Sequence, residues 1–216
     1  MTEQDIRKTY ALMKEHFIGD YKFKVQPDGL VDVVGTIELM YALDDLIPVQ
    51  FGEINGNLNI SNCGLKSLKG CGHTITGSLN ASSNLITSLE GAPQEVGFIS
   101  LNNNQELTSL EGAPSMVRTT MLITRTSITN LKGLPTQPGA IGRIKITYKE
   151  NLPLLRLLVA GEITVERPGY GFTHMSLEQP LQAILNDDRW VGKGKSHMLN
   201  CALAMKKAGY VGNASW

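Results

Sequence analysis

Residues 88–93 read SLEGAP, and residues 109–114 read SLEGAP again. Two related strings flank this pair, SLKGCG at 67–72 and NLKGLP at 130–135. The leucine of each string falls at position 68, 89, 110 or 131, so the chain repeats itself every 21 residues. A repeat of this length indicates a stack of similar units, each of which buries its apolar edge only against its neighbours.

Apolar residues recur at fixed places before each of these leucines. A pair spaced two apart comes first and predicts a short strand with one buried face. An Asn, Cys or Thr follows, and a leucine or isoleucine comes three residues before the anchor leucine. The resulting pattern, L-x-L-x-x-[N/C]-x-L-x-x-L, is the leucine-rich-repeat signature. The third unit starts its pair one residue early, at Ile99, which predicts a longer turn around Asn104.

A fifth unit (Ile144 to Leu155) and a degenerate one before the first (Val33 to Ile47) bring the count to about six coils. The predicted fold class is therefore an α+β solenoid, a leucine-rich-repeat-like right-handed coil with a parallel β-sheet. We expect an N-terminal helix and hairpin cap over 1–32, the solenoid over 33–160, and a C-terminal strand and two-helix cap over 161–216, because solenoid ends need capping.

The caps have their own signals. Residues 2–17 predict a helix with a Thr2–Asp5 capping box and one apolar face. Residues 21–25 and 30–34 predict a hairpin around the turn QPDG, and 162–165 predict a last strand. Two helices should follow, one from a cap at Ser176 to about Asp188 and one from about 195 to 208, ending at Gly209. Their apolar residues are expected to pack on the open end of the core: Leu181, Ile184, Leu185, Leu199, Ala202 and Leu203.

Composition limits the function classes. The formal net charge is zero, which argues against a dedicated nucleic-acid binder. Three cysteines without metal-ligand spacing predict reduced thiols, and the chain shows neither a signal peptide nor an apolar run long enough for a membrane span. A cytoplasmic protein is expected. The charged residues are unevenly distributed. Residues 25–65 contain Asp and Glu but no Lys or Arg, and residues 189–216 contain Lys and Arg but no Asp or Glu, so we expect an electrostatic dipole along the molecule.

The repeated SLEGAP units, the segments VQPDGLVDVVGTIEL (25–39) and IPVQFGEINGNLNIS (47–61), and the ending GKGKSHMLNCALAMKKAGYVGNASW (192–216) together define a pattern. It resembles a family of short leucine-rich-repeat-like proteins found in tailed bacteriophage genomes, over nearly the whole chain. The resemblance implies a phage origin, hence the cytoplasm of an infected bacterium, and this fold. It implies no mechanism and supplies no catalytic residue.

No convergent catalytic set emerges from the residue types. GKGKS at 192–196 lacks the first glycine of a phosphate loop, because Arg189 stands there, although Lys193 and Lys195 form a candidate anion site at a helix start. Cys201 and His197 are four apart on a predicted helix, where the apolar neighbours favour a buried thiol. His16, His73 and His174 share no metal-ligand spacing with a carboxylate. We therefore predict no enzyme, no metal site and no cofactor.

Binding residues are expected among the side chains that point outward from the strands, since repeat proteins usually bind through their open sheet. The middle of that sheet is small and polar, whereas the C-terminal half gathers aromatic and basic residues, the composition of binding hot spots. The predicted binding residues are Tyr41, Phe98, Leu122, Arg125, Arg143, Lys145 and Tyr148.

Three hypotheses follow, and the first is favoured. It is a non-enzymatic interaction protein that binds a bacterial host or defence protein through the open sheet, for which the resemblance is the only argument about the partner. The second is a nucleic-acid or nucleotide binder that uses the basic C-terminal helices with Arg143 and Lys145, a partner class disfavoured but not excluded by the charge. The third is head-to-tail self-assembly of acidic and basic ends.

Overall fold

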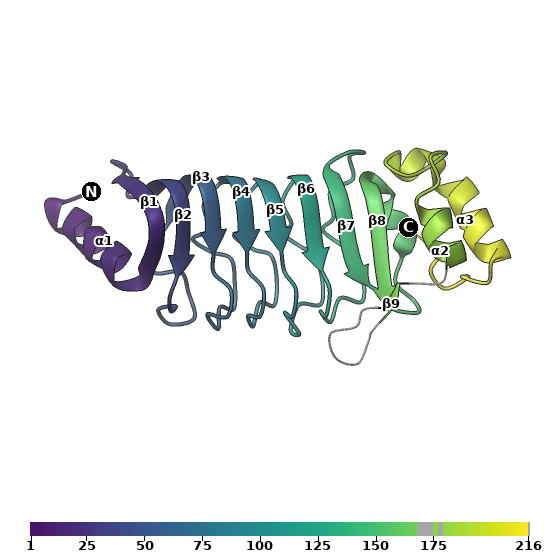
Figure 1. Ribbon diagram of the computed structural model, residues 1–216, viewed down its shortest axis with the longest axis horizontal. Helices are drawn as coiled ribbons and strands as arrows, with labels where there is room; N and C mark the ends of the chain where they lie inside the picture. Colours follow the sequence, from purple (N-terminus) through teal and green to yellow (C-terminus); the bar gives the residue numbers. More distant parts are fainter. Residues whose placement is uncertain (168–174, 177–178, 216) are drawn as a thin grey trace.

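In the computed structural model, which describes residues 1–167, 175–176 and 179–215, the chain winds into an elongated stack of coils (Figure 1). One nine-stranded sheet runs along the stack, with the strands in chain order from β1 to β9. The helix α1 lies at one end and the helices α2 and α3 lie at the other (Figure 1). The fold is thus the predicted solenoid with a helix at each end.

The order of the strands in the sheet is the order of the elements along the chain. The strands are β1 (Phe17–Val25), β2 (Val31–Leu39), β3 (Phe51–Asn59), β4 (Thr74–Asn80), β5 (Glu95–Ser100), β6 (Met116–Ile123), β7 (Ile141–Thr147), β8 (Ala160–Arg167) and β9 (Met175–Ser176). The α-helices are α1 (Glu3–His16), α2 (Gln179–Leu185) and α3 (Met198–Lys207), and two 3₁₀ helices are η1 (Leu154–Val159) and η2 (Gly194–His197).

Strands β2 to β8 pair in parallel, one per coil, whereas β1 and β9 pair antiparallel at the two ends. The repeat positions coincide in the register, as in Ile54↔Ile75 and Ile75↔Val96. The early pair of the third unit is also confirmed, because Leu79 pairs with Ile99. The repeat leucines and isoleucines form one continuous buried core behind the sheet.

The SLEGAP string forms a tight turn that stacks directly on the preceding coil. The Ala92 N–H donates to the Leu89 carbonyl at 2.9 Å, and Gly91 between them has φ +85°, as a type II turn requires. Each repeat glycine also lies against the backbone of the coil before it, so a Cβ would approach that backbone within 2.1–2.7 Å at Gly70, Gly91, Gly112 and Gly133. The glycine of the repeat is therefore required by conformation and by space together.

The asparagine of the repeat pattern points inward and joins two coils. The buried Asn84 accepts hydrogen bonds at its Oδ1 from the N–H groups of Cys63 (3.0 Å) and Leu65 (3.1 Å). Its Nδ2 donates to the Ile60 carbonyl at 2.8 Å. Asn104 takes the same place in the next coil. These amides satisfy buried backbone groups that the turn leaves without strand partners.

The N-terminal cap is the predicted helix followed by the predicted hairpin. Thr2 caps α1, and its side chain and that of Asp5 bond each other's backbone N–H in a capping box. Strands β1 and β2 then form the hairpin. The sequence predicts one apolar face from Ile6, Tyr10, Met13 and Phe17, of which Met13 and Phe17 are buried. Ile6 and Tyr10 are 36% and 42% exposed, so only the C-terminal part of α1 lies on the core.

In the C-terminal cap, side chains bond part of the edge of β8. The Ile163 N–H donates to Asn186 Oδ1 at 2.8 Å, and the Val165 N–H donates to Gln182 Oε1 at 3.1 Å. Helix α2 and the residue after it thus occupy part of the free edge of β8. Edge strands need such protection, because their unpaired groups otherwise attract other chains.

Two expectations about this cap are wrong. Ser176 lies in β9, three residues before α2 begins, and is not the start of a long helix. Leu199 and Leu203 are 68% and 49% exposed, because α3 turns Cys201 and Met205 toward the core instead. His174 lies outside the described residues.

We expect Gly112→Ala to destabilise the fold by about 2–5 kcal/mol, from left-handed strain and overpacking together. The φ there is +86°, and a Cβ would meet the Leu89 backbone at 2.6 Å. Gly64→Ala is the matched control, since φ is +71° with nothing within 4 Å, so only about 1–2 kcal/mol of strain is expected. Urea unfolding measures both, and equal losses would show that coil contact does not constrain Gly112.

Candidate binding face

The open face is the surface formed by the strand side chains that point away from the core. On its N-terminal half the small polar residues bond one another across strands. Asn57 donates to Thr36 Oγ1 at 3.1 Å and accepts from the Ser78 N–H at 2.9 Å. Thr76 likewise donates to Asn55 Oδ1 at 3.0 Å. Polar groups on this half thus bond one another within the sheet.

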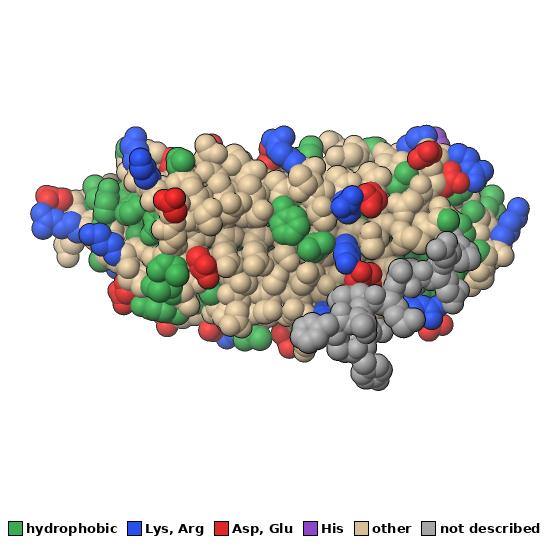
Figure 2. Space-filling model, in the orientation of Figure 1, with side chains coloured by type: hydrophobic (Ala, Val, Ile, Leu, Met, Phe, Trp, Pro, Cys, Tyr) green, Lys and Arg blue, Asp and Glu red, His purple; other side chains and the backbone are tan. Residues whose placement is uncertain are grey.

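Phe98 and Leu122 interrupt this polar surface, and we call them the central patch. Phe98 lies in β5 opposite Ser78 of β4, and Leu122 lies in β6 opposite Ser100. Both side chains are half-buried. Figure 2 shows a hydrophobic group in the middle of this face, with polar surface around it. A partly exposed aromatic ring with an aliphatic neighbour on a rigid sheet is a typical anchor for a protein partner.

Arg143 and Lys145 lie on β7, but each is paired with an acid on β8. The Arg143 guanidinium lies 2.6 Å from Glu162 Oε2, and Lys145 Nζ lies 2.6 Å from Glu166 Oε1. The expected basic surface beside the aromatic residues is therefore neutralised by the last coil. This arrangement weakens the argument for an anionic partner at β7.

Tyr148 is half-buried and anchors the end of the chain. Its hydroxyl donates to Asn213 Oδ1 at 3.0 Å. The buried Asn213 in turn donates from Nδ2 to the carbonyls of Lys149 and Leu152, both at 2.9 Å. Asn213 thus satisfies backbone carbonyls of the last coil with its side-chain amide, as Asn84 does in an inner coil. Tyr148 thus makes a contact with the C-terminal segment that its sequence position does not reveal, because its partner is 65 residues away.

Arg125 and Tyr41 lie apart from the central patch. Arg125 is exposed in the turn after β6, with φ 55°, and its N–H donates to Thr147 Oγ1 at 2.9 Å. Tyr41 follows β2 and is 48% exposed, and its ring packs on His16 with centroids 4.6 Å apart. Tyr41 therefore lies at the β2 end of the sheet, whereas Lys145 lies opposite Leu122 in the register of β6 and β7. Phe98 and Leu122 are the apolar members of this set on the neighbouring strands β5 and β6.

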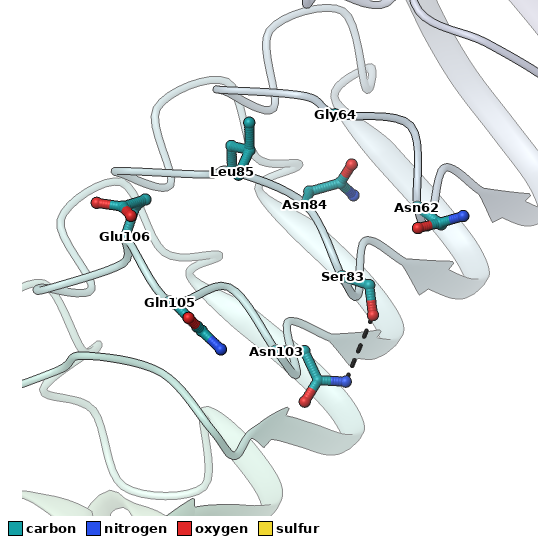
Figure 3. Close-up of a pocket in the computed structure, with 8 residues that line it drawn as sticks. All are labelled: Asn62, Gly64, Ser83, Asn84, Leu85, Asn103, Gln105 and Glu106. Atoms are coloured by element: carbon teal, nitrogen blue, oxygen red, sulfur yellow. Dashed lines mark hydrogen bonds between the residues drawn. The ribbon is translucent and has the colours of Figure 1, made fainter.

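A hollow lies beside the turns that follow the strands, away from the central patch (Figure 3). It is lined by Asn62, Gly64, Ser83, Asn84, Leu85, Asn103, Gln105 and Glu106. The Asn103 amide donates to Ser83 Oγ at 3.4 Å across it. Glu106 is the one carboxylate among the lining residues, and none of the others is a histidine, cysteine or lysine that could act as its catalytic partner.

The C-terminal candidates lie on the helical cap. Lys193 and Lys195 are exposed around the short helix η2, which ends before α3 begins. Cys201 is buried, and this burial raises the pKa of its thiol to about 12. A thiol that stays protonated is a poor nucleophile, so pairing with His197 is not supported as catalytic chemistry.

Two absences apply to residues 1–167, 175–176 and 179–215. No cluster of three or more His, Cys, Asp or Glu side chains there is arranged to hold a metal ion. No helix in the same ranges has the length and apolar character needed to cross a bilayer.

The thiols give a direct test of the buried environment. Burial raises the pKa of both Cys71 and Cys201. In a Cys63→Ser variant we therefore expect neither remaining thiol to react with a disulfide reagent at about pH 8, and both to react after unfolding. Absorbance of the released thiolate measures this. Fast modification of native Cys201 would contradict the assignment and restore it as a candidate nucleophile.

Comparisons with protein-family models, with curated proteins and with solved structures find no match to this chain. The candidate site therefore stands on the geometry of the chain alone.

Proposed function

We propose that this chain is a non-enzymatic protein–protein interaction module that binds its partner through the open face. The observation that carries the proposal is the central patch, a half-buried Phe98 on β5 with Leu122 on the neighbouring strand β6, opposite the serines Ser78 and Ser100. Aromatic anchors with a polar surround account for most of the binding energy at many protein interfaces. The rigid sheet presents both side chains without an ordering cost on binding.

The partner class comes from the sequence resemblance to phage proteins. We propose a bacterial host or defence protein, bound in the cytoplasm of the infected bacterium. This part of the proposal is an argument from analogy. The nucleic-acid alternative has less support, because the cations of β7 are paired with Glu162 and Glu166.

The test compares capture of bacterial proteins by the wild-type chain and by a Phe98→Ser, Leu122→Ser variant, after nuclease treatment. Loss of both anchors should weaken capture of a specific partner about tenfold or more, since each 1.4 kcal/mol is tenfold in affinity. The captured protein is then purified and titrated against both forms. Mass spectrometry and calorimetry give the two readouts.

Val34→Ser is the matched control, because Val34 is an apolar side chain of β2 that is 59% exposed and lies outside the central patch. Circular dichroism confirms that all three proteins are folded. Equal affinity of wild type and double variant would contradict the proposal, as would the absence of any partner retained by the wild type.

A further inference from the structure

Helix α3 presents an apolar stripe to solvent. Leu199 and Leu203 are spaced four apart, so they share one face, and they are 68% and 49% exposed. The exposed Lys206 and Lys207 continue that face at the end of the helix. We call these four residues the α3 surface. Its leucines are not needed for the core, which takes Cys201 and Met205 from the opposite side of the helix.

The segment after β2, at the other end of the solenoid, exposes a second apolar group. Met40, Tyr41, Leu43 and Leu46 are each 43–48% exposed, and with Asp44 and Asp45 they make what we call the β2-turn surface. Figure 2 shows hydrophobic side chains next to an acidic one at the lower end of β1 and β2.

The backbone fixes the two leucines side by side. The N–H of Leu43 donates to the Leu46 carbonyl at 3.0 Å, and the reverse bond measures 2.9 Å. Asp44 and Asp45 form the tip of this turn with φ of 52° and 61°. Two apolar side chains and two carboxylates therefore project together from one narrow turn.

The two surfaces are complementary in both apolar character and charge. Each offers a pair of exposed leucines, one beside lysines and the other beside aspartates. Lys206, Lys207 and Asp44 have no ion-pair partner in the part of the chain that the structure describes, whereas Asp45 pairs with Lys66 at 2.7 Å. Near α3, the acid Asp187 is already paired with Arg189 at 2.7 Å, so it is engaged elsewhere and leaves Lys206 and Lys207 to an incoming carboxylate.

We propose that the chain associates head to tail with a second copy of itself, the α3 surface of one copy lying on the β2-turn surface of the next. The contacting surfaces differ, so each added copy leaves one of each kind free, and assembly continues into a ring or an open filament. The central patch on β5 and β6 takes no part, so this proposal is independent of the proposed function. Burial of the leucines supplies the attraction, and the charges set the orientation.

Two variants separate the two surfaces. In the turn variant, Leu43→Lys and Leu46→Lys place cations opposite the lysines of α3. In the α3 variant, Leu199→Ser and Leu203→Ser remove the apolar contact without adding a charge that the lysines of the turn variant could attract. All four side chains are at least 44% exposed, so the fold should be retained, and circular dichroism checks this. Val34→Lys, at a site 59% exposed on the open face, is the matched control.

Sedimentation velocity over about 1–100 µM, a range that brackets micromolar dissociation constants, measures the association at low salt. Wild type and Val34→Lys should grow in size with concentration, and added salt should shift them toward monomer. Each double variant alone should stay monomeric. An equimolar mixture should form a one-to-one dimer and nothing larger, because the turn variant retains an intact α3 surface and the α3 variant retains an intact turn.

A wild-type monomer over the whole range would overturn the proposal, and the leucine surfaces would then be sites for other partners. The proposal also fails if either variant alone associates like wild type, or if the mixture remains monomeric. Because no partner protein is present, these outcomes are independent of the Phe98 experiment.

Discussion

The close approach of one coil's turn to the backbone of the coil before it is the constraint on which the structure depends. At Gly112 a Cβ would lie 2.6 Å from the Leu89 backbone, and Gly91 is equally crowded against Lys69. This contact sets how the coils stack, so the strands above them lie in register and the core leucines meet in rows. A chain with larger residues at these positions would have to separate its coils and expose the core.

The same stacking explains why function is expected on the open face. The turns and the core are occupied by packing, with Asn84 and Asn104 committed to buried backbone groups. Only side chains that point away from the core are free to vary, and most of those described on the N-terminal half bond one another. Phe98 and Leu122 belong neither to the buried core nor to the hydrogen-bonded polar residues, since they are apolar and half-buried on the open face. An apolar pair that the fold does not require is the best candidate for contact with another molecule.

The period of 21 residues and the repeat leucines were sufficient to predict the solenoid, its parallel sheet and its capped ends. Side-chain pairing across the last coil was not predictable in this way. That coil is shorter, with Arg143 opposite Glu162 only 19 residues away, so a fixed period does not reveal the ion pair. The contact of Tyr148 was unpredictable for a similar reason, since Asn213 lies 65 residues further along the chain.

The exposed leucines mark another limit of pattern reading. Leu199 and Leu203 have the spacing of a core-facing helix, yet α3 uses its Cys201 face. Periodicity identifies an apolar stripe and does not say which of two stripes meets the core. Leu43 is one of the apolar repeat positions in the degenerate unit from Val33 to Ile47, yet it is 44% exposed beside the tight turn at Asp44 and Asp45.

The most direct test of the central claim is photo-cross-linking from position 98. A photoreactive phenylalanine analogue replaces Phe98, and the same analogue at Val34 serves as the comparison on the same sheet. The account predicts one specific bacterial protein cross-linked from position 98, displaced by excess unlabelled wild type, and little from position 34. Equal cross-linking from both positions, or none from position 98, would contradict a binding site centred on Phe98.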